Sequence, residues 1–549
     1  MQNYLLQGSL TYNKSFAEKH NVKLLALMES ARSKSDQMSA KRFLSIPIDQ
    51  LYVGDALLQE GTSANDQIYN YTSNGIVGRV NYDYAGKYLV EYSFRYDGSS
   101  RFPEDKRWGF FPNYQLGWRI SEESFIKNNF SFIDNIKIRG TYGILGDDAA
   151  ANAYSFISGY DYPYAGGSTQ QGKYPSGYFF NGVFTNVLGF RAPANMDVTW
   201  YTSKTVDIGL DVDLWRNKLG FTVDLFKRDR EGLLANRNVT VPSTFGTNMP
   251  QVNINSDQTQ GVDVEIRHRN KVGDLNYSAV GTFSYTRTKL IHVEGSNKIS
   301  YGNSMAYWKN GKGSRYNDVW FGTEGDGQYQ SYEEISLSSL PTGTNILPGD
   351  FRYKDWNNDG VIDGNDDHPI AIGIKDSDGD YPSNPLVFFG LNLSLEYKGF
   401  DMNMMFQGTA MTYIAYAEQL ATPLAWDGNA LDYLTNRWHP VDPKANPYDP
   451  ANQWVSGKYQ YGAKAGDVNS THMIQDGKYI RLKTLELGYS VPQKLLKRIK
   501  VKDLRVYTSG YNLLTLTKIE ALDPEHPAED SGYTYPLNKT INFGVNITF

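Results

Sequence analysis

The 549-residue chain contains no cysteine, and this absence excludes several kinds of protein. Without a thiol there is no disulfide framework, no Cys-ligated zinc or iron–sulfur cluster and no cysteine nucleophile. The chain also has little net charge, because 54 Lys and Arg stand against 60 Asp and Glu, a formal balance of −6. A nucleic-acid-binding protein would show a basic face, so we expect no nucleic-acid partner.

Long apolar runs are missing as well. No stretch reaches the ~18 consecutive apolar residues that a membrane-spanning helix needs. Residues 1–21 show no basic region followed by an apolar region, so no signal peptide is visible. The mean hydropathy of −0.51 suggests a soluble protein. That inference fails for a membrane β-barrel, which places apolar residues only at every second position.

Aromatic residues, in contrast, are abundant: the chain has 41 Tyr, 26 Phe and 10 Trp. Many of them alternate with polar residues at a period of two, which places one set on each face of a β-strand. The stretch YLVEYSFRYD (88–97) shows the pattern, and INFGVNITF (541–549) repeats it at the end of the chain. One face of each predicted strand is therefore apolar, and the other is polar and often charged.

The alternation predicts about fifteen strands, which start near residues 4, 21, 75, 87, 113, 135, 203, 218, 259, 275, 386, 400, 478, 502 and 539. Tight turns, such as 84–88 and 397–400, alternate with long loops. The long loops are expected at about 38–70, 146–200, 230–257, 290–385, 413–477 and 517–537. This asymmetry is typical of outer-membrane barrels, whereas a soluble sandwich has loops at both ends. The sequence thus predicts an all-β fold, a transmembrane antiparallel up-and-down β-barrel, with a soluble sandwich as the alternative.

Several stretches are more specific than the alternation. The chain resembles the SusC/RagA-type TonB-linked outer-membrane transporters over most of its length and in the family's order. The stretches are DGSSRFPEDKRWGFFPNYQLGWRISEESF (97–125), IDNIKIRGTYGILGDD (133–148), YKDWNNDGVIDGNDD (353–367), FFGLNLSLEYKGFDMNMMFQGT (388–409), YIRLKTLELGYSVPQKLLKR (479–498), YNLLTLTKIEALDPE (511–525) and INFGVNITF (541–549). The resemblance implies a TonB-dependent receptor in the cell outer membrane of Bacteroidetes. It also implies uptake of glycans, oligosaccharides or peptides, with a SusD-like surface lipoprotein, the TonB complex and the lipid bilayer as partners.

The resemblance also implies parts that this sequence does not show. The resemblance implies that a full member of the family has a signal peptide, a small carboxypeptidase-like domain, a TonB-box and a plug domain, followed by a barrel of roughly 22 strands. With about fifteen strands and no recognisable plug, residues 1–549 resemble the C-terminal part of that barrel. Unpaired strand edges in hydrocarbon are costly. We therefore expect either an incomplete barrel or edges that pair with another polypeptide, unless the strand count is off by one.

The sharpest local motif is DWNNDGVIDGND (355–366), whose spacing fits a calcium loop of the EF-hand type. The predicted ligands are Asp355, Asn357, Asp359, Val361 through its carbonyl oxygen, Asp363 and Asp366. Such a loop needs closely spaced oxygen ligands and a glycine for the sharp turn, here Gly360. Asp replaces the usual Glu at the last position, which weakens the affinity. The alternative is a metal-free turn, because Asp, Asn and Gly dominate turns.

Catalytic motifs are absent: the seven His residues are scattered, and neither HExxH, G-x-S-x-G nor a P-loop occurs. We therefore expect no enzyme. Aromatic residues of the long loops could stack on sugars or form the loops' own small cores; they are Tyr301, Tyr307, Trp308, Trp320, Trp426, Trp438 and Trp454. Aromatic residues near strand ends fit an interfacial girdle; they are Tyr84, Tyr88, Trp108 and Trp215. No residue is assigned to substrate binding.

Two other functions fit parts of the pattern. One is a secreted, calcium-stiffened β-protein that binds or cleaves glycans, and the other is a passive porin-like channel. Dependence on detergent separates the secreted protein from a membrane protein. A plug and a TonB-box encoded directly before Met1 would distinguish a transporter from a porin.

Overall fold

The fold is described from a computed structural model of the chain. The described residues are 2–35, 39–42, 59–62, 69–149, 151, 155–161, 177–186, 188–190, 192–237, 242, 249–294, 315–341, 345–373, 385–462, 470–497, 500–525 and 535–549. Among them, no helix is both long enough and apolar enough to cross a membrane.

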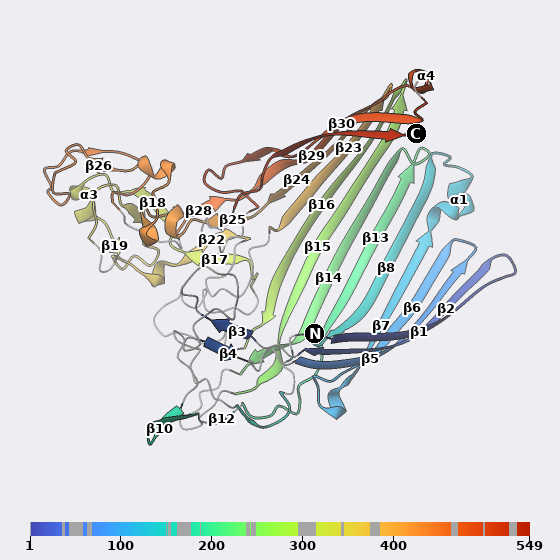
Figure 1. Ribbon diagram of the computed structural model, residues 1–549, viewed down its shortest axis with the longest axis horizontal. Coiled ribbons are helices and arrows are strands. Elements are labelled where there is room, and N and C mark those ends of the chain that lie inside the picture. Colours follow the sequence, from blue (N-terminus) through green and yellow to red (C-terminus); the bar gives the residue numbers. More distant parts are fainter. Residues whose placement is uncertain are drawn as a thin grey trace. The chain divides into compact units, whose positions relative to one another are not determined.

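One sheet of fifteen strands dominates the structure, and each strand lies beside its neighbour in sequence order (Figure 1). Its strands are β1 Gln2–Phe16, β2 His20–Ser35, β5 Tyr69–Tyr84, β6 Tyr88–Ser99, β7 Trp108–Arg119, β8 Ile133–Asp147, β13 Tyr201–Leu214, β14 Leu219–Asn236, β15 Gln251–Val272, β16 Leu275–His292, β23 Val387–Tyr397, β24 Phe400–Ala410, β29 Tyr479–Ser490, β30 Asp503–Thr517 and β31 Thr540–Thr548. The predicted all-β fold and the fifteen strands are confirmed, because period-two alternation is a reliable signal of strands with two unlike faces.

The strands at the short-turn rim are joined by turns in which the backbone enters the left-handed region. Ala85 and Gly86, between β5 and β6, have φ of 54° and 70°. Lys398 and Gly399, between β23 and β24, have φ of 48° and 90°. Two successive residues with positive φ give the twist that these tight hairpin connections require. These turns fix the register, so that Tyr397 lies directly opposite Phe400.

The long connectors hold short strands: β3 Ser39–Arg42, β4 Gln59–Thr62, β9 Tyr160–Asp161, β10 Gly177–Phe180, β11 Val183–Asn186, β12 Gly189–Phe190, β17 Val319–Gly322, β18 Gly325–Gln328, β19 Leu340–Pro341, β20 Phe351–Tyr353, β21 Val361–Ile362, β22 His368–Ile372, β25 Tyr413–Ala415, β26 His439–Pro440, β27 Trp454–Val455 and β28 Ile474–Asp476. The helices are η3 Glu104–Lys106, η4 Ile120–Glu122, α1 Ser124–Lys127, α3 Tyr332–Leu337, η6 Gly364–Asp366, η7 Glu418–Leu420, η8 Ala425–Asp427, η9 Asp432–Thr435 and α4 Gln493–Leu496.

One connector is shorter than the sequence suggests. A loop was expected over 230–257, but β14 continues to Asn236 and β15 begins at Gln251. Residues 255–260 of β15 (NSDQTQ) are all polar, so the alternation by which the other strands are recognised is interrupted there. The backbone ladder does not need apolar side chains to continue where water surrounds it, because each added residue still pairs its N–H and C=O groups.

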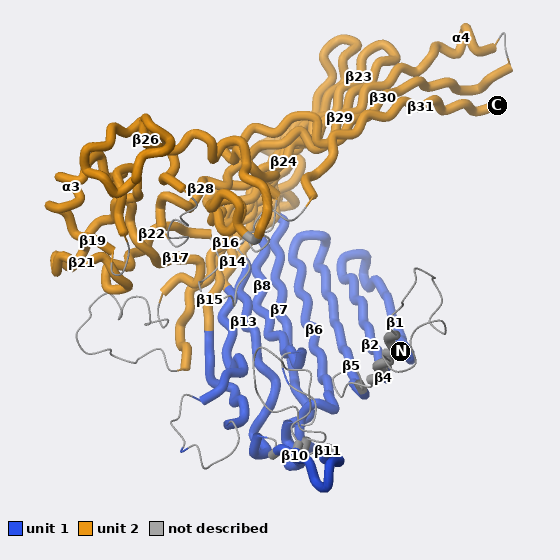
Figure 2. Tube along the Cα trace, turned by 60° about the vertical axis from the view of Figure 1, so that its left-hand side comes forward, with its two compact units in different colours: residues 1–119, 139–207, 228–256 blue, residues 120–138, 208–227, 257–549 orange. Residues whose placement is uncertain are grey.

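The chain divides into two compact units, coloured separately in Figure 2. Unit 1 comprises residues 1–119, 139–207 and 228–256, and unit 2 comprises 120–138, 208–227 and 257–549. In the part of the chain that the structure describes, unit 1 has one cluster of buried apolar residues, made of Phe102, Ala151 and Val198. Unit 2 has two, made of Ile414, Tyr416, Leu420 and Ile519, and of Phe351, Ala421 and Met473. All three clusters lie in connectors, not between faces of the large sheet.

Candidate functional site

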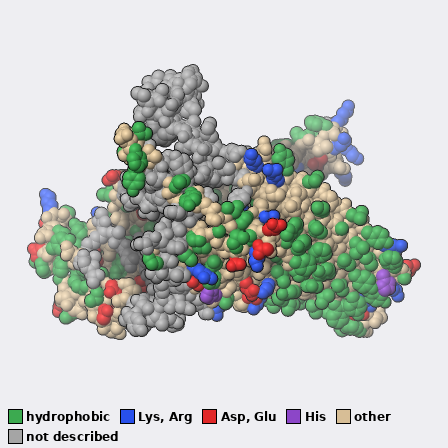
Figure 3. Space-filling view, turned by 90° about the horizontal axis from the view of Figure 1, so that it is seen from below, with side chains coloured by type: hydrophobic (Ala, Val, Ile, Leu, Met, Phe, Trp, Pro, Cys, Tyr) green, Lys and Arg blue, Asp and Glu red, His purple; other side chains and the backbone are tan. Residues whose placement is uncertain are grey.

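The two faces of the large sheet differ sharply in chemistry, as β6 and β7 show. Tyr92 lies opposite Tyr114 and Val90 lies opposite Leu116, and residues directly opposite share a face. Leu116 on this face is 62% exposed. Residues between them, such as Glu91, belong to the other, polar face. Figure 3 shows hydrophobic side chains gathered into a broad surface patch in which charged groups are sparse.

Aromatic rings lie near both ends of the apolar face. At the short-turn end, Tyr84 stacks on Tyr88 with ring centroids 6.4 Å apart, and Trp215 follows the last residue of β13. At the long-loop end, Tyr96 stacks on Trp108 at 4.9 Å. The stretch from Tyr88 to Tyr96 falls within the roughly 9–11 residues that a tilted strand needs to cross a bilayer. The predicted girdle positions therefore bound a band that suits a hydrocarbon core.

The polar face carries charges that are paired between strands, in several cases across an intervening strand. Arg505 on β30 donates through Nε to Asp401 on β24 at 3.0 Å, and through Nη2 to Glu486 on β29 at 2.6 Å. Arg267 on β15 donates through Nη2 to Asp213 on β13 at 3.1 Å. Such partly exposed pairs each contribute about 0–1 kcal/mol. Their main consequence is a hydrated wall with alternating charges, which suits the lining of an aqueous lumen.

A groove of about 600 Å³ lies on the polar face across β14, β15, β16, β23 and β24, and its lining residues all belong to unit 2. Three carboxylates line it: Asp224, Asp263 and Glu265. Two apolar side chains also reach this face, since Phe388 lies opposite Ser284 and Met405 lies opposite Asn392. An aromatic ring beside carboxylates can stack on a ligand and accept its O–H or N–H groups. Sequence reasoning missed Phe388, although it is out of phase with the alternation of Leu391 to Tyr397.

The described residues of 315–373, 411–478 and 518–525 form what we call the outer lobe. Short strands pair within it, β17 with β22, β18 with β20, β19 with β21, β25 with β28 and β26 with β27. An isolated bridge between Thr323 and Ser470 joins two of its connectors. Tyr329, wholly buried, donates its hydroxyl to the carbonyl oxygen of Ser339 at 3.0 Å. Burial raises the pKa of Tyr329 to about 12, so this hydroxyl stays protonated and keeps donating.

A buried ion cluster fastens the segment after β30 to β29. Arg481 is 2% exposed, and its Nη2 lies 2.7 Å from Asp523 Oδ1. Its Nη1 lies 3.1 Å from Glu525 Oε1, and Lys483 donates to the same carboxylate at 2.8 Å. Removing one partner from a buried pair leaves an uncompensated charge, which costs about 3–5 kcal/mol. The cluster therefore holds residues 518–525 firmly at the outer end of the sheet.

The predicted calcium loop lies in the outer lobe, and Asp366 closes it. This side chain is fully buried, and its Oδ1 accepts the backbone N–H of Trp356 at 2.9 Å. Its Oδ2 accepts the N–H of Asp363 at 3.0 Å, and Asp363 in turn caps η6. In the described residues the loop is flanked by the short strands β20 and β22, not by helices of the EF-hand kind. Within the loop, β21 pairs in parallel with β19.

The other predicted ligands bind the loop's own backbone. Asp355 Oδ2 accepts the N–H of Gly360 at 2.9 Å and the Ser339 hydroxyl at 2.8 Å. The hydrogen bond from the Ser339 hydroxyl has the largest effect and lowers the pKa of Asp355, and hydrogen bonds from backbone N–H groups lower it further. Asp359 Oδ1 accepts the N–H of Val361 at 2.9 Å, and Asn357 Oδ1 accepts that of Asp359 at 2.9 Å. In the part of the chain that the structure describes, no three acidic or His side chains converge closely enough to hold a metal.

The loop aromatics are placed unevenly. Trp438 is 5% exposed and donates through its ring N–H to Gln328, so it is a core residue of the outer lobe. Trp320 and Trp454 are half-buried. Tyr301, Tyr307, Trp308 and the side chain of Trp426 lie outside the described residues. Trp438 is therefore buried away from any sugar, and sugar stacking by the other loop aromatics stays a prediction.

Comparisons with known proteins agree with this architecture. The family described as "TonB dependent receptor-like, beta-barrel" matches residues 35–398. "TonB-dependent receptor P3" of Formosa agariphila is 27% identical over 100% of this chain and 52% of its own length. "TonB-dependent receptor SusC" of Bacteroides thetaiotaomicron is 26% identical over 90% of this chain and 46% of its own length. The chain thus spans about half the length of the curated relatives it matches.

Solved structures show the same fold. The structure of the RagAB peptide transporter superposes with a TM-score of 0.71 at 19% identity, over 100% of this chain and 55% of that chain. The RagAB peptide importer in the "open-open" state gives 0.72 at 19% identity, over 100% of this chain and 54% of that chain. The profile match, the fifteen-stranded sheet and its two unlike faces agree. The chain belongs to the β-barrel family of TonB-dependent receptors.

Proposed function

We propose that this chain forms part of the β-barrel wall of an outer-membrane importer. The importer takes up glycans, oligosaccharides or peptides with energy supplied through TonB. Barrels of this family are outer-membrane proteins, and the outer membrane is where this chain resides. The observation that carries the proposal is the sheet with one apolar, girdle-bounded face and one polar face of paired charges. Such a sheet can meet lipid and water at once.

Two classes of cargo, glycans and peptides, are implied by the resemblance to the SusC/RagA-type transporters. One relative is a SusC, and two solved neighbours are RagAB peptide transporter structures. The polar groove offers carboxylates and an exposed ring, groups that suit the hydroxyls of a sugar and the amides of a peptide equally. We therefore propose a polar, hydrogen-bonding cargo. We also propose that the chain is not an enzyme, since the matching family consists of receptors.

The experiment measures uptake of labelled oligosaccharides and peptides by cells that make the whole protein. We expect uptake of one class to fall to background when a protonophore removes the energy that TonB transmits. Asp263→Asn combined with Glu265→Gln should raise the half-saturating concentration several-fold, whereas Asp274→Asn at a turn should not. Uptake that survives the protonophore favours a passive porin. Recovery of the protein from the medium without detergent favours the secreted alternative.

We propose two partners for the whole protein, a SusD-like surface lipoprotein and the TonB complex. The outer lobe supports the first, because it is a folded body with its own apolar clusters at the long-loop rim. A tagged whole protein extracted in mild detergent should bring down one lipoprotein in about equal amount. Recovery of the tagged protein alone under several mild detergents would contradict this partner.

We propose that the loop 355–366 binds calcium weakly and so stiffens the outer lobe. The support is local: the loop already has the turn geometry at Asn358 and Gly360, with φ of 58° and 87°. Asp355, Asp359 and Asp363 each have a second carboxylate oxygen that could turn to a cation, while Asp366 holds the backbone. Isothermal titration with calcium should show one site with a dissociation constant of about 10⁻⁴–10⁻³ M.

A further inference from the structure

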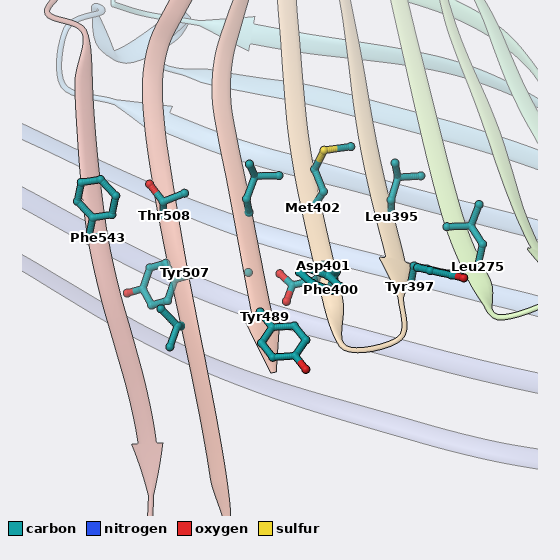
Figure 4. A pocket seen from close by; sticks show the side chains of 13 residues that line it. Leu275, Leu395, Tyr397, Phe400, Asp401, Met402, Tyr489, Tyr507, Thr508 and Phe543 are labelled. Atoms are coloured by element: carbon teal, nitrogen blue, oxygen red, sulfur yellow. The ribbon is translucent and has the colours of Figure 1, made fainter. Parts of the chain in front are cut away.

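The apolar face of unit 2 contains a groove of about 750 Å³ near the short-turn rim. Side chains of six neighbouring strands, β16, β23, β24, β29, β30 and β31, line it. Figure 4 shows Leu395, Met402 and Phe543 in a row across three of these strands. Tyr397, Phe400 and Tyr489 lie nearer the rim, and the rings of Phe400 and Tyr489 have centroids 4.5 Å apart.

The groove is almost wholly apolar. Its one carboxylate, Asp401, lies on the other face of β24, where Arg505 donates to it at 3.0 Å. Thr508, opposite Phe543, is the main polar side chain on the groove's own face. The volume falls within the roughly 300–1,000 Å³ of small-molecule sites, and the lining suits an alkyl chain but not a sugar or a peptide.

A basic connector borders the groove. The twelve residues VPQKLLKRIKVK (491–502) join β29 to β30 and carry five Lys or Arg and no Asp or Glu. It begins two residues after Tyr489, which lines the groove. In the connector's α4, Leu496 is buried and anchors the turn, while Leu495 is 59% exposed.

The lysines of this connector point to solvent. Lys494, Lys497, Lys500 and Lys502 are all exposed, and none has an ion-pair partner among the described residues. Lys398, in the turn between β23 and β24, adds a further cation at the rim, and Asp274 lies 3.4 Å from it. Clusters of Lys and Arg beside a membrane-embedded surface attract anionic lipid head groups.

We propose that this rim of unit 2 binds one anionic phospholipid, with an acyl chain in the groove and the phosphate head group on the described connector lysines Lys494, Lys497, Lys500 and Lys502. Short turns of outer-membrane barrels face the periplasm, so the lipid belongs to the inner leaflet. The lysines supply charge complementarity, and the exposed Leu495 supplies an apolar contact at the level where head group meets acyl chain. The site rests on the membrane location of the barrel and is independent of what the barrel imports.

The second long connector of the short-turn rim provides the matched control. Residues 120–132 join β7 to β8 and also contain a short helix, α1. They carry Glu122, Glu123 and Lys127, and Lys127 donates to Glu122 at 2.7 Å. This connector has a similar length and position along the rim but lacks the excess of unpaired cations.

The experiment is native mass spectrometry of the full-length protein purified in a non-ionic detergent, with added phosphatidylglycerol or phosphatidylcholine. We expect one phosphatidylglycerol retained at least five-fold better than phosphatidylcholine. Lys494→Gln, Lys497→Gln, Lys500→Gln and Lys502→Gln together should remove that preference, whereas Lys127→Gln should leave it unchanged. Met402→Trp, which fills the groove, should lower retention of both lipids.

Three results would overturn the site. They are equal retention of the two lipids by the unmodified protein, an unchanged preference in the four-lysine variant, and full displacement by an equal concentration of glycerol phosphate. The last would mean that the groove contributes nothing. If the four-lysine variant does not assemble, the preference of the unmodified protein and its loss on adding salt decide the matter, because screening weakens exposed charge pairs.

Discussion

The large sheet and the outer lobe use the same apolar residues in opposite ways. Phe543 on β31 is 85% exposed, whereas Phe351 in the lobe is 6% exposed and packs against Ala421 and Met473. Among the described residues, no cluster of buried apolar side chains belongs to the sheet itself, because its apolar face is turned outward. The lobe folds as a small water-soluble domain does, by enclosing its apolar groups. One chain therefore contains segments adapted to two solvents.

The charged residues divide in the same way. On the sheet, Arg505 and its partners are partly exposed, so water screens them. At the lobe boundary, Arg481 is almost fully enclosed with Asp523 and Glu525. The sheet can lose a pair at little cost, while the boundary cluster cannot. Stability in the lobe is therefore concentrated in a few groups, and stability in the wall is spread along the backbone ladder.

The largest expected effect comes from Phe351→Ala. It leaves a cavity against Met473 and His472, and should lower the stability of the lobe by about 3–5 kcal/mol. Hydrogen exchange followed by mass spectrometry should show faster exchange across 345–373 and 470–478. The matched change Phe543→Ala should cost less than about 1 kcal/mol, because lipid chains refill the space. Equal losses at the two positions would erase the distinction between wall and lobe.

The next effect tests the lipid-facing band directly. Tyr114 packs on Tyr92 with ring centroids 5.1 Å apart, midway between the two girdles. Tyr114→Arg should lower the unfolding free energy in liposomes by roughly 2–4 kcal/mol, since a charge near the bilayer midplane is poorly solvated. Urea titration measures the loss.

The neighbouring residue supplies the control for that change. Gln115 lies on the polar face, opposite Glu91. Gln115→Arg adds the same charge one residue away, but on the side that meets water and beside a carboxylate. It should change the unfolding free energy by less than about 1 kcal/mol. A loss as large as that of Tyr114→Arg would contradict the assignment of the faces.

Much of the wall could be predicted from the sequence, because its strands obey one local rule. In YLVEYSFRYD the period of two identifies both the strand and its lipid-facing side. The rule fails where a strand leaves the membrane band, as at residues 255–260 of β15, and where a bulge interrupts it, as between Leu482 and Thr484. At such points the side-chain pattern no longer reports the backbone ladder.

The lobe and the candidate sites were less predictable for a different reason. Arg481 meets Asp523 across 42 positions, and no periodicity links them. The calcium motif gave the right residues for a tight turn, but not that Asp366 would be buried under backbone N–H groups. Calcium binding at this loop stays a prediction. Contacts between distant connectors depend on packing, which a single local pattern does not encode.

A smaller effect should follow from pH, through His472 in the lobe. Its ring stacks on Phe351 with centroids 4.2 Å apart, and Nε2 donates to the carbonyl oxygen of Arg352 at 3.2 Å. Burial lowers the pKa of His472. The unfolded chain therefore binds a proton near the ordinary pKa of about 6.5, where the folded lobe still excludes it. Stability should fall as pH drops below about 6.5 and level off below the folded pKa.

The variant His472→Gln checks this origin. It keeps a donor for Arg352 but has no group that titrates in this range, so the decline below about pH 6.5 should flatten. Lobe stability measured by limited proteolysis from pH 7.5 to 5 gives the comparison. The wall, whose strands contain no comparable buried histidine among the described residues, should show no matching change. An unchanged slope in the variant would assign the pH dependence to other groups.

The smallest expected effect is the stabilisation of the outer lobe, but not of the large sheet, by calcium. Ligand that binds only the folded state stabilises it by RT ln(1 + [L]/Kd), so calcium at twice its dissociation constant should stabilise the lobe by about 0.6 kcal/mol. A chelator should therefore speed the hydrogen exchange of residues 355–366 and leave the exchange of the strands of the sheet unchanged.

The variant Asp359→Asn tests whether the loop is the calcium site. It should abolish the increment while keeping the turn, because its amide oxygen can still accept the N–H of Val361. The control Asp378→Asn, in the acidic stretch DSDGD (376–380) outside the described residues, should keep the increment. If Asp359→Asn and the unmodified protein respond equally to calcium, the metal acts elsewhere, and the loop is an ordinary turn held by Asp366.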